Sequence, residues 1–462
     1  MNRSSMNHFT SDRGPGARLV PRRIATLVCA ALLTAGLSAS ASATDLLQTY
    51  QEALQNDAQF ASARAAQVAG EEKSVQGRAG LLPKVNFTGS DMRTTSDYSM
   101  NSVSMSGGNA FNSSYTLQLT QPLLHWENWQ QFEQSKLMVL ASDAQFAQAK
   151  LDLMLRVAQS YFDVLSAQDT LESVQANKTA ITEQLAIAKR NFEVGTTTIT
   201  DQHETQARYD LAVAQEFAAL NDLEIKRSVL QQIVGHVPAG LAALQKGVQL
   251  SAPQPAVLSD WVSAAEVNNY NVVGAQVNQE IARRSISANR AGHLPTLDLV
   301  ANANRSNSSA VAILNQPAFS QNSHAIGLQL NVPLFSGFAV TSKVREAIAL
   351  EDKAGNDLEV AKRSAALAAR QAFLGVNSGL AQVKAYEAAE ISSQSALASN
   401  VLGYQVGVRI NIDVLNAQQQ LYTTQQNLAK ARYDTLMNGL RLKAASAALK
   451  EDDLAQVNAL LH

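Results

Sequence analysis

The sequence repeats itself at a nearly constant spacing, and this constrains its fold more than any other feature. Gly80-Leu-Leu-Pro recurs as Gly292-His-Leu-Pro, and Val194-Gly195 recurs as Val406-Gly407. Both pairs are 212 residues apart, since 292 − 80 and 407 − 195 give the same number. A shared offset at distant places indicates a tandem duplication. We therefore expect two structural repeats, 44–240 and 258–450, joined by a linker at 241–257 and followed by a tail at 451–462.

Residues 1–43 have the three parts of a secretory signal peptide. Arginines at 18, 22 and 23 precede an apolar run at 24–37, and small residues follow up to Ala41-Ser42-Ala43. That run has 14 residues, whereas a membrane-spanning helix needs about 20. We therefore expect cleavage before Thr44. The only cysteine, Cys29, lies in the run after Val28 rather than after a small residue, so the mature chain is expected to have neither a disulfide nor a lipid anchor.

Each repeat is predicted to contain two short strands with one apolar face. In the first repeat, Val85 and Phe87 alternate with polar residues, and Leu117 and Leu119 do so again after a Ser/Thr/Gly/Asn tract at 94–114. Because that tract is rich in turn residues, we expect it to be a loop. The second repeat has the same arrangement, with apolar faces formed by Leu297, Leu299, Ala301, Ala303, and by Ile326, Leu328, Leu330, Val332.

Long helices are predicted to flank these strands. Residues 46–79 contain no proline and are expected to form one helix. After Pro122, proline is absent until Pro238, which leaves room for a helix at about 125–194 and another at about 200–234. Apolar residues recur at spacings of three and four, the pattern of a coiled-coil seam: Leu151, Leu155, Ala158, Phe162, Leu165; then Phe373, Val376, Leu380, Val383; and Val414, Leu421, Leu428.

A sheet made of only four strands from one chain leaves its two outer strands each without a hydrogen-bonding neighbour on one side. An open edge in lipid would leave backbone groups unsatisfied at several kcal/mol each, so we expect several chains to pool strands into a closed β-barrel. Polar faces would line its lumen and apolar faces would meet lipid. The alternative is a soluble periplasmic coiled-coil scaffold with incidental hairpins and no pore.

The composition argues against several other classes of function. The 462-residue chain is 46% hydrophobic and only 16% charged, with a net charge of −2, so no basic field favours nucleic acid. Five of the seven histidines, at 125, 203, 236, 293 and 324, are scattered singly and show no metal-ligand spacing. The chain has no phosphate-binding loop and no nucleophile motif. We therefore expect a protein that is not an enzyme and binds no cofactor.

The residues above resemble the TolC family of outer-membrane efflux and secretion channels. The resemblance covers nearly all of the mature chain and is most specific at Gly292–Leu299, Arg190–Asp201, Gly403–Gly407, Asp413–Ala417 and Ala431–Asp434. It implies a mainly α protomer in a homotrimer, with a 12-stranded outer-membrane β-barrel, four strands from each chain. A periplasmic coiled-coil tunnel would continue the barrel and taper shut at its inner end.

The resemblance also implies roles for particular residues. Polar links would close the tunnel between Asp201 and Tyr404, and between Arg409 and both Thr200 and Asp201. Carboxylates would ring the entrance at Asp413 and at a second position that here is Asn416, so this ring would carry three carboxylates where the family has six. Gly195 and Gly407 would contact the hairpin tip of a periplasmic adaptor.

The implied partners are therefore an adaptor (membrane fusion) protein, an inner-membrane ABC or RND/MFS transporter, and outer-membrane lipid. The implied function is a passive exit duct of a Gram-negative bacterium for type I protein secretion, multidrug efflux or both. The residues do not separate these two kinds of cargo, because the selecting site would lie in the inner-membrane partner.

Overall fold

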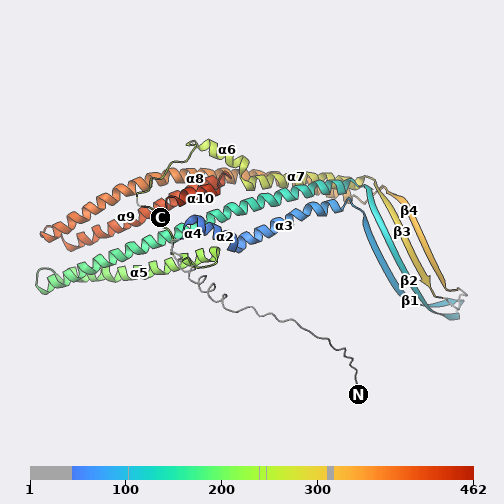
Figure 1. Ribbon diagram of the computed structural model, residues 1–462, viewed down its shortest axis with the longest axis horizontal. Helices are drawn as coiled ribbons and strands as arrows, with labels where there is room; N and C mark the ends of the chain where they lie inside the picture. The colour runs from blue at the N-terminus through green and yellow to red at the C-terminus, as the bar shows by residue number, and fades with distance from the viewer. Residues whose placement is uncertain (1–43, 102, 239, 246, 310–316, 462) are drawn as a thin grey trace, which may run out of the picture. The chain divides into compact units, whose positions relative to one another are not determined.

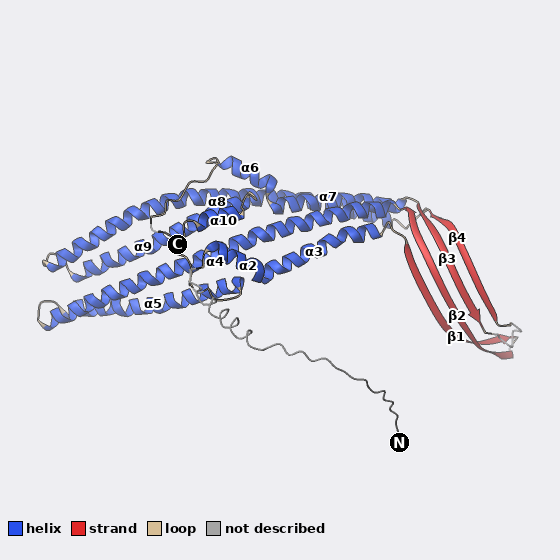
Figure 2. Cartoon of the chain, viewed as in Figure 1, coloured by secondary structure: helices blue, strands red, loops and turns tan. Residues whose placement is uncertain are grey.

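The computed structural model describes residues 44–101, 103–238, 240–245, 247–309 and 317–461. The predicted signal peptide, residues 1–43, and Cys29 with it, lie outside the described residues. From Thr44 onward the chain forms one unit of long helices and a four-stranded sheet, as Figures 1 and 2 show.

The first repeat contains helices and two strands in the predicted order. Helices α2 (Leu46–Asn56) and α3 (Ala58–Ala79) precede strands β1 (Lys84–Met100) and β2 (Val103–Leu124). Helix α4 (Trp126–Glu193) follows with 68 residues, which makes it about 100 Å long at 1.5 Å per residue. Helix α5 (Ile199–Val234) returns alongside it. The bounds of α4 and α5 confirm the two long helices predicted after Pro122.

The second repeat has the same elements in the same order. Helices α6 (Leu258–Asn268) and α7 (Tyr270–Arg290) lead through the short 3-10 helix η1 (Ala291–His293) to strands β3 (Thr296–Ser308) and β4 (Phe319–Asn331). Helices α8 (Ala339–Gln405) and α9 (Asn411–Ala445) complete it. The contacts match those of the first repeat, with α4 against α5, α8 against α9, α3 against α4 and α7 against α8.

Hydrogen bonds also repeat at the offset of 212 residues. The amide of Thr196 donates to the Asn191 carbonyl at 2.8 Å, and the amide of Val408 donates to the Gly403 carbonyl at 2.9 Å. Both donors and both acceptors are 212 positions apart, since 408 − 196 and 403 − 191 agree. The duplication read from the sequence is therefore a duplication of structure, down to single turns at the helix ends.

The expected loop at 94–114 is wrong, because most of this tract is β-strand. Thr94 pairs with Ala110 and Thr95 with Asn109, so β1 and β2 continue to a turn at Asn101. Small polar residues have weak strand propensity, but a partner strand in register satisfies their backbone groups whatever the side chains are. The turn-forming composition was therefore overruled by pairing between strands.

The prediction of a single helix at 46–79 is also wrong, because the helix is interrupted at Asp57. This residue is extended, with φ −68° and ψ 115°, and its side chain caps α3 by accepting from the Phe60 amide at 2.6 Å. Arg156 of α4 forms an ion pair with the same carboxylate at 2.9 Å. The equivalent residue 212 positions later, Asn269, breaks α6 from α7 in the same way. A search for prolines alone misses a break made by an N-cap residue.

The predicted seam forms much of the helical core. Leu151, Ala158, Phe162 and Leu165 of α4 are buried in a cluster that includes residues of α2, α9 and α10. In the second repeat Phe373, Val376 and Val383 are buried, as are Val414, Leu421 and Leu428. Spacing of three and four therefore identified the buried face correctly. In the described part of the chain, no helix is both long enough and apolar enough to span a membrane.

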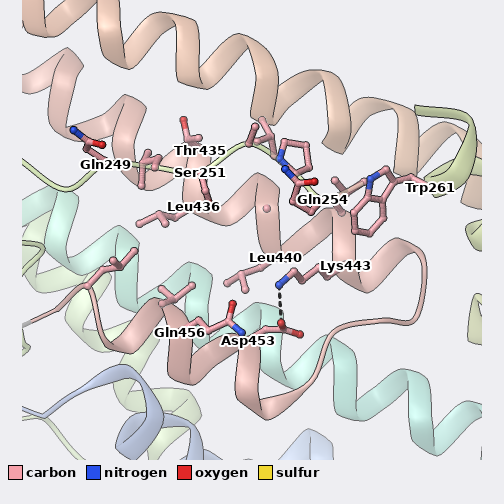
Figure 3. Close-up of a pocket in the computed structure, with 18 residues that line it drawn as sticks. Gln249, Ser251, Gln254, Trp261, Thr435, Leu436, Leu440, Lys443, Asp453 and Gln456 are labelled. Carbon is pink, nitrogen blue, oxygen red and sulfur yellow. Dashed lines mark hydrogen bonds and ion pairs between the residues drawn. The ribbon is translucent and has the colours of Figure 1, made fainter. Parts of the chain in front are cut away.

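The tail at 451–462, for which no element was predicted, contains helix α10 (Glu451–Asn458). Leu454 is fully buried, and the Asn458 side chain accepts from the Leu46 amide at 2.9 Å. The expected linker at 241–257 contains no helix or strand in its described residues beyond isolated bridges. Part of it, at 249–254, lies across α9 and α10 over a hollow of about 390 Å³, in which Lys443 and Asp453 pair at 2.6 Å (Figure 3).

Candidate functional site

The sheet has one apolar and one polar face along the part nearest the helices. In the register, Phe87 lies opposite Leu117, which lies opposite Ala303. On the other face Thr88 lies opposite Thr116, which lies opposite Asn304. Hydrogen bonds tie the polar rows together, and the Thr116 hydroxyl donates to the Asn304 side chain at 3.0 Å. The two faces are those predicted from the alternating pattern.

Nothing in the described chain covers the apolar face. Ile326, Leu328 and Leu330 are 76%, 66% and 63% exposed, which is unusual for three neighbouring aliphatic residues on one strand. The sheet order is β1-β2-β3-β4, so β1 and β4 are edge strands whose outer sides have no partner in the described residues. This sheet can satisfy its backbone and its apolar face only against another molecule.

We call the turns that join α4 to α5 and α8 to α9 the tips of the two helix pairs. A second hollow, of about 550 Å³, lies at these tips. It is lined by the tip of the first repeat and the tip of the second, and its lining includes four of the predicted residues, namely Asp201, Tyr404, Gly407 and Arg409. Thr200 is adjacent in sequence but does not line it. The tertiary structure therefore brings three of the four predicted gate residues, Asp201, Tyr404 and Arg409, around one hollow.

The predicted pairs are not the ones that form within this chain. The Tyr404 hydroxyl accepts a long hydrogen bond of 3.4 Å from the Asn191 amide nitrogen. Arg409 lies 3.6 Å from Asp413, one turn along α9. Among the described residues no bond joins Asp201 to Tyr404, or Arg409 to Thr200 or Asp201.

A buried hydrogen bond beneath the tips was missed by the sequence analysis. The Asn411 side chain donates to the Thr205 hydroxyl at 2.7 Å, and the two residues are 1% and 0% exposed. Thr205 in turn donates to the Asp201 carbonyl at 2.7 Å. This bond joins α9 of the second repeat to α5 of the first. A polar residue at a buried seam position would have predicted this bond from the sequence. Asn411 was not recognised as one, because it lies just before the predicted seam, which begins at Val414.

The amide at position 416 has a specific partner. Arg208 of α5 donates to the Asn416 side-chain oxygen at 3.0 Å. Asp413, the other predicted entrance residue, lies in the first turn of α9, where the helix dipole stabilises a negative charge. Both predicted ring positions are thus occupied by oxygen atoms with a neighbouring arginine, and Arg208 is a residue that sequence reasoning did not single out.

The two predicted adaptor-contact glycines have the same unusual backbone. Gly195 has φ +78° and Gly407 has φ +77°. Residues other than glycine adopt this left-handed backbone conformation only at a cost in free energy. A Cβ atom built at either position would meet no atom within 4 Å. Glycine is therefore needed here for the turn, and the surface around each one is open within this chain.

Comparison with known proteins matches both repeats. The family model described as outer membrane efflux protein matches residues 49–236 and 261–448, and 261 − 49 again gives 212. The Vibrio cholerae outer membrane protein TolC is 34% identical over 433 residues, which cover 94% of this chain and 97% of that protein. The Dickeya chrysanthemi proteases secretion protein PrtF is 34% identical, covering 95% of each chain.

The fold matches solved outer-membrane channels as well. The structure of VceC from Vibrio cholerae superimposes with a TM-score of 0.73 at 18% identity, covering 87% of this chain and 95% of that one. Because its sequence identity to this chain is low, the VceC structure supports the fold of this protein but not its function. The duplicated family match and the relatives that share a third of their residues along nearly the whole chain show that this protein belongs to the outer membrane efflux protein family, as TolC does.

Proposed function

We propose that three copies of this chain close a 12-stranded barrel in the outer membrane and continue it into the periplasm as a helical duct. The observation that carries this proposal is the sheet, with an exposed apolar face, a polar face and two edges without partners. Barrel closure gives every edge a neighbour and places the apolar face in lipid. The number three comes from the family resemblance.

The duct is passive, and the tips of its helix pairs act as its gate. Arg409 and Asp413 are exposed enough that their pair contributes at most about 1 kcal/mol, and the Asn191–Tyr404 bond is long. Contacts of this strength suit a latch, because a partner that binds the open state a little more tightly can release it.

The gate is opened from the periplasm by an adaptor working with an inner-membrane ABC or RND/MFS transporter. Open space around Gly195 and Gly407 at the tips gives a helical hairpin room to approach the backbone closely. The cargo includes secreted protein, because a relative at 34% identity is named for protease secretion. Drug efflux through the same duct needs only a different inner-membrane partner.

Planar bilayers test the channel directly. Purified protein should run as a heat-modifiable trimer and give discrete single-channel steps. A periplasmic scaffold with no pore, the competing function, predicts neither steps nor detergent-dependent solubility. Complementation of a strain that lacks its own exit duct, scored separately for a secreted protease and for drug resistance, then separates the two kinds of cargo.

A further inference from the structure

The apolar face of the sheet changes character towards its hairpin end. Along β2, Phe111 and Tyr115 lie on the same face as Leu117 and are 57% and 42% exposed. Arg93 of β1 lies opposite Phe111, and Arg305 of β3 lies opposite Tyr115. An aromatic column on β2 is therefore flanked by an arginine on each neighbouring strand. We call these four residues the arginine–aromatic patch.

The patch lies at the depth where an outer leaflet would meet water. Arg305 follows Leu297, the first outward aliphatic residue of β3, by eight residues, or about 27 Å along a strand at 3.4 Å per residue. A strand tilted by about 40° turns this into a rise of about 20 Å, and Phe111 lies further out, so the patch brackets the top of an apolar band about 25 Å tall. Aromatic residues commonly mark this interface.

The aromatic rings are held in place by their neighbours. The Arg93 guanidinium lies 5.6 Å from the centre of the Phe111 ring, a cation–π distance. The Phe111 amide donates to the Ser309 hydroxyl at 2.8 Å, and its carbonyl accepts from the Ser309 amide at 2.8 Å. The Tyr115 ring stacks beside Phe87 with 6.5 Å between centres. The patch is thus set on paired backbone rather than on a loose turn.

Neither arginine is neutralised within the described chain. Arg93 and Arg305 are exposed, and no described carboxylate lies within 4.0 Å of either, whereas many other arginines of this protein have such a partner. In the described chain neither guanidinium group is held in an ion pair, so both have donors available for an anion at the headgroup level. Guanidinium binds phosphate with paired N–H donors, which makes arginine the preferred residue for such headgroups.

We propose that the arginine–aromatic patch binds the sugar–phosphate headgroup of a lipopolysaccharide in the outer leaflet, with Arg93 and Arg305 each donating to a phosphate. This inference rests on the proposed barrel, which places the face in lipid. Tyr115 and Phe111 lie between the two phosphate contacts, and the acyl chains lie along Leu117, Leu119 and the aliphatic residues of β3 and β4. A lipid with two phosphates matches two separated arginines better than a lipid with one.

One nearby acid opposes this binding. Asp91 lies on the same face, opposite Ser113, between the rows of Arg93 and Arg305. Its carboxylate repels a phosphate held by the two arginines. Replacing Asp91 by asparagine should therefore tighten the lipid, which gives the proposal a prediction in the opposite direction from loss of the arginines.

The test measures lipopolysaccharide binding to the purified trimer in phosphatidylcholine nanodiscs by native mass spectrometry. We expect Arg93→Gln and Arg305→Gln to weaken binding about fivefold each, the factor for one basic side chain at an anionic lipid surface. Asp91→Asn should strengthen it. The matched control is Lys84→Gln with Arg345→Gln, which should leave binding unchanged, because Lys84 is exposed at the helical end of β1 and Arg345 is exposed near the start of α8.

Two further arms identify the ligand. Lipopolysaccharide stripped of its phosphates should bind the wild type and the double arginine variant equally, and inorganic phosphate should fail to compete. Equal binding of the intact lipid by the wild type and the double variant would overturn the proposal, as would full competition by inorganic phosphate. Single-channel steps are recorded from the same purified proteins in planar bilayers, so loss of lipid binding with normal steps leaves the proposed function standing, and absent steps in the wild type count against the function instead.

Discussion

The side chain of Asn411 donates a 2.7 Å hydrogen bond to the hydroxyl of Thr205, and both residues are buried. Each belongs to a different repeat, so this bond holds the two helix pairs together just beneath their tips. Ile181 of α4, Ala212 of α5 and Leu415 of α9 form a small apolar cluster that also joins the two repeats. In the proposed duct, moving one helix pair away from the other requires this bond to break.

Removal of this bond should therefore ease opening. Thr205→Val keeps the shape of the side chain but leaves Asn411 without its acceptor, at about 1–3 kcal/mol per protomer. We expect a larger single-channel conductance in planar bilayers. The matched control is Thr424→Val, since the hydrogen bonds of the buried Thr424 hydroxyl in the described chain stay within its own helix: it donates to the Gln420 carbonyl and accepts from the Gln420 side chain. Equal conductance in both variants would contradict a role for the Asn411–Thr205 bond in closure.

The exposed contacts at the tips should matter too, though less for each one. Tyr404→Phe removes the acceptor of the 3.4 Å bond from Asn191, and Arg409→Ala removes the guanidinium 3.6 Å from Asp413. Each loss is worth at most about 1 kcal/mol per protomer, so we expect conductance to rise in both variants. Arg370→Ala, an exposed arginine within α8, serves as the control. If conductance is unchanged in both tip variants, the latch is ruled out.

Because position 416 is an asparagine and not an aspartate, we expect cations to block the duct only weakly. Arg208 should limit how far Asn416→Asp strengthens this block. Asn416→Asp places a carboxylate beside the guanidinium that now lies 3.0 Å from the amide oxygen, so much of the new charge is neutralised. We expect block by La³⁺ to strengthen a little in Asn416→Asp and clearly more in Asn416→Asp with Arg208→Gln. The La³⁺ concentration for half block measures this, and no change in the double variant would place Asn416 away from the cation path.

The buried pair of Asp169 and Tyr433 gives a prediction about pH. The Tyr433 hydroxyl donates to Asp169 at 2.8 Å. Burial raises the pKa of Asp169 above its ordinary value of 3.8, and Glu172 adds to this, whereas the bond from Tyr433 and the charge of Arg432 oppose it. Because the ionised form is disfavoured in the fold, this group destabilises the protein above its raised pKa. That penalty is relieved as the pH falls through the raised pKa towards 3.8.

Asp169→Asn should remove this contribution at every pH. We expect the variant to be at least as stable as the wild type above the raised pKa of Asp169, and its urea midpoint to depend less on pH as the pH falls from that raised pKa towards 3.8. Asp434→Asn, an exposed acid paired only with Lys430, is the control. A pH profile of Asp169→Asn that overlays the wild type would contradict the assignment.

Gly407 should be intolerant of a side chain because of its backbone and not for lack of space. Its φ of +77° costs other residues about 1–2 kcal/mol, although a Cβ would meet nothing within 4 Å. Gly407→Ala should speed hydrogen exchange at the tip of the α8–α9 pair. Gly439→Ala inside α9 also has open space but helical geometry, so it should slow exchange locally. Similar effects of the two substitutions would contradict this account.

The sequence by itself determined the repeat, the long helices and the two faces of the sheet. These follow from local periodicity, since spacing of three and four marks a buried helix face and alternation marks a strand face. It also contained the repeated Val-Gly pairs, whose glycines have a positive φ in the turns at the tips. The family resemblance added a prediction of gate residues, of which Asp201, Tyr404 and Arg409 lie around one hollow in the structure.

Tertiary structure alone decided the rest, because it depends on partners far away in the chain. The tract at 94–114 is mostly strand because the end of β1 and the start of β2 pair with each other, despite residues that favour turns. Asp57 ends a helix because its side chain caps the next one and meets Arg156. Asn411 finds Thr205, and Asn416 finds Arg208, across 206 and 208 residues. No local sequence pattern identifies such pairs, because the two hydrogen-bonding side chains come within reach of each other only when the helices pack together.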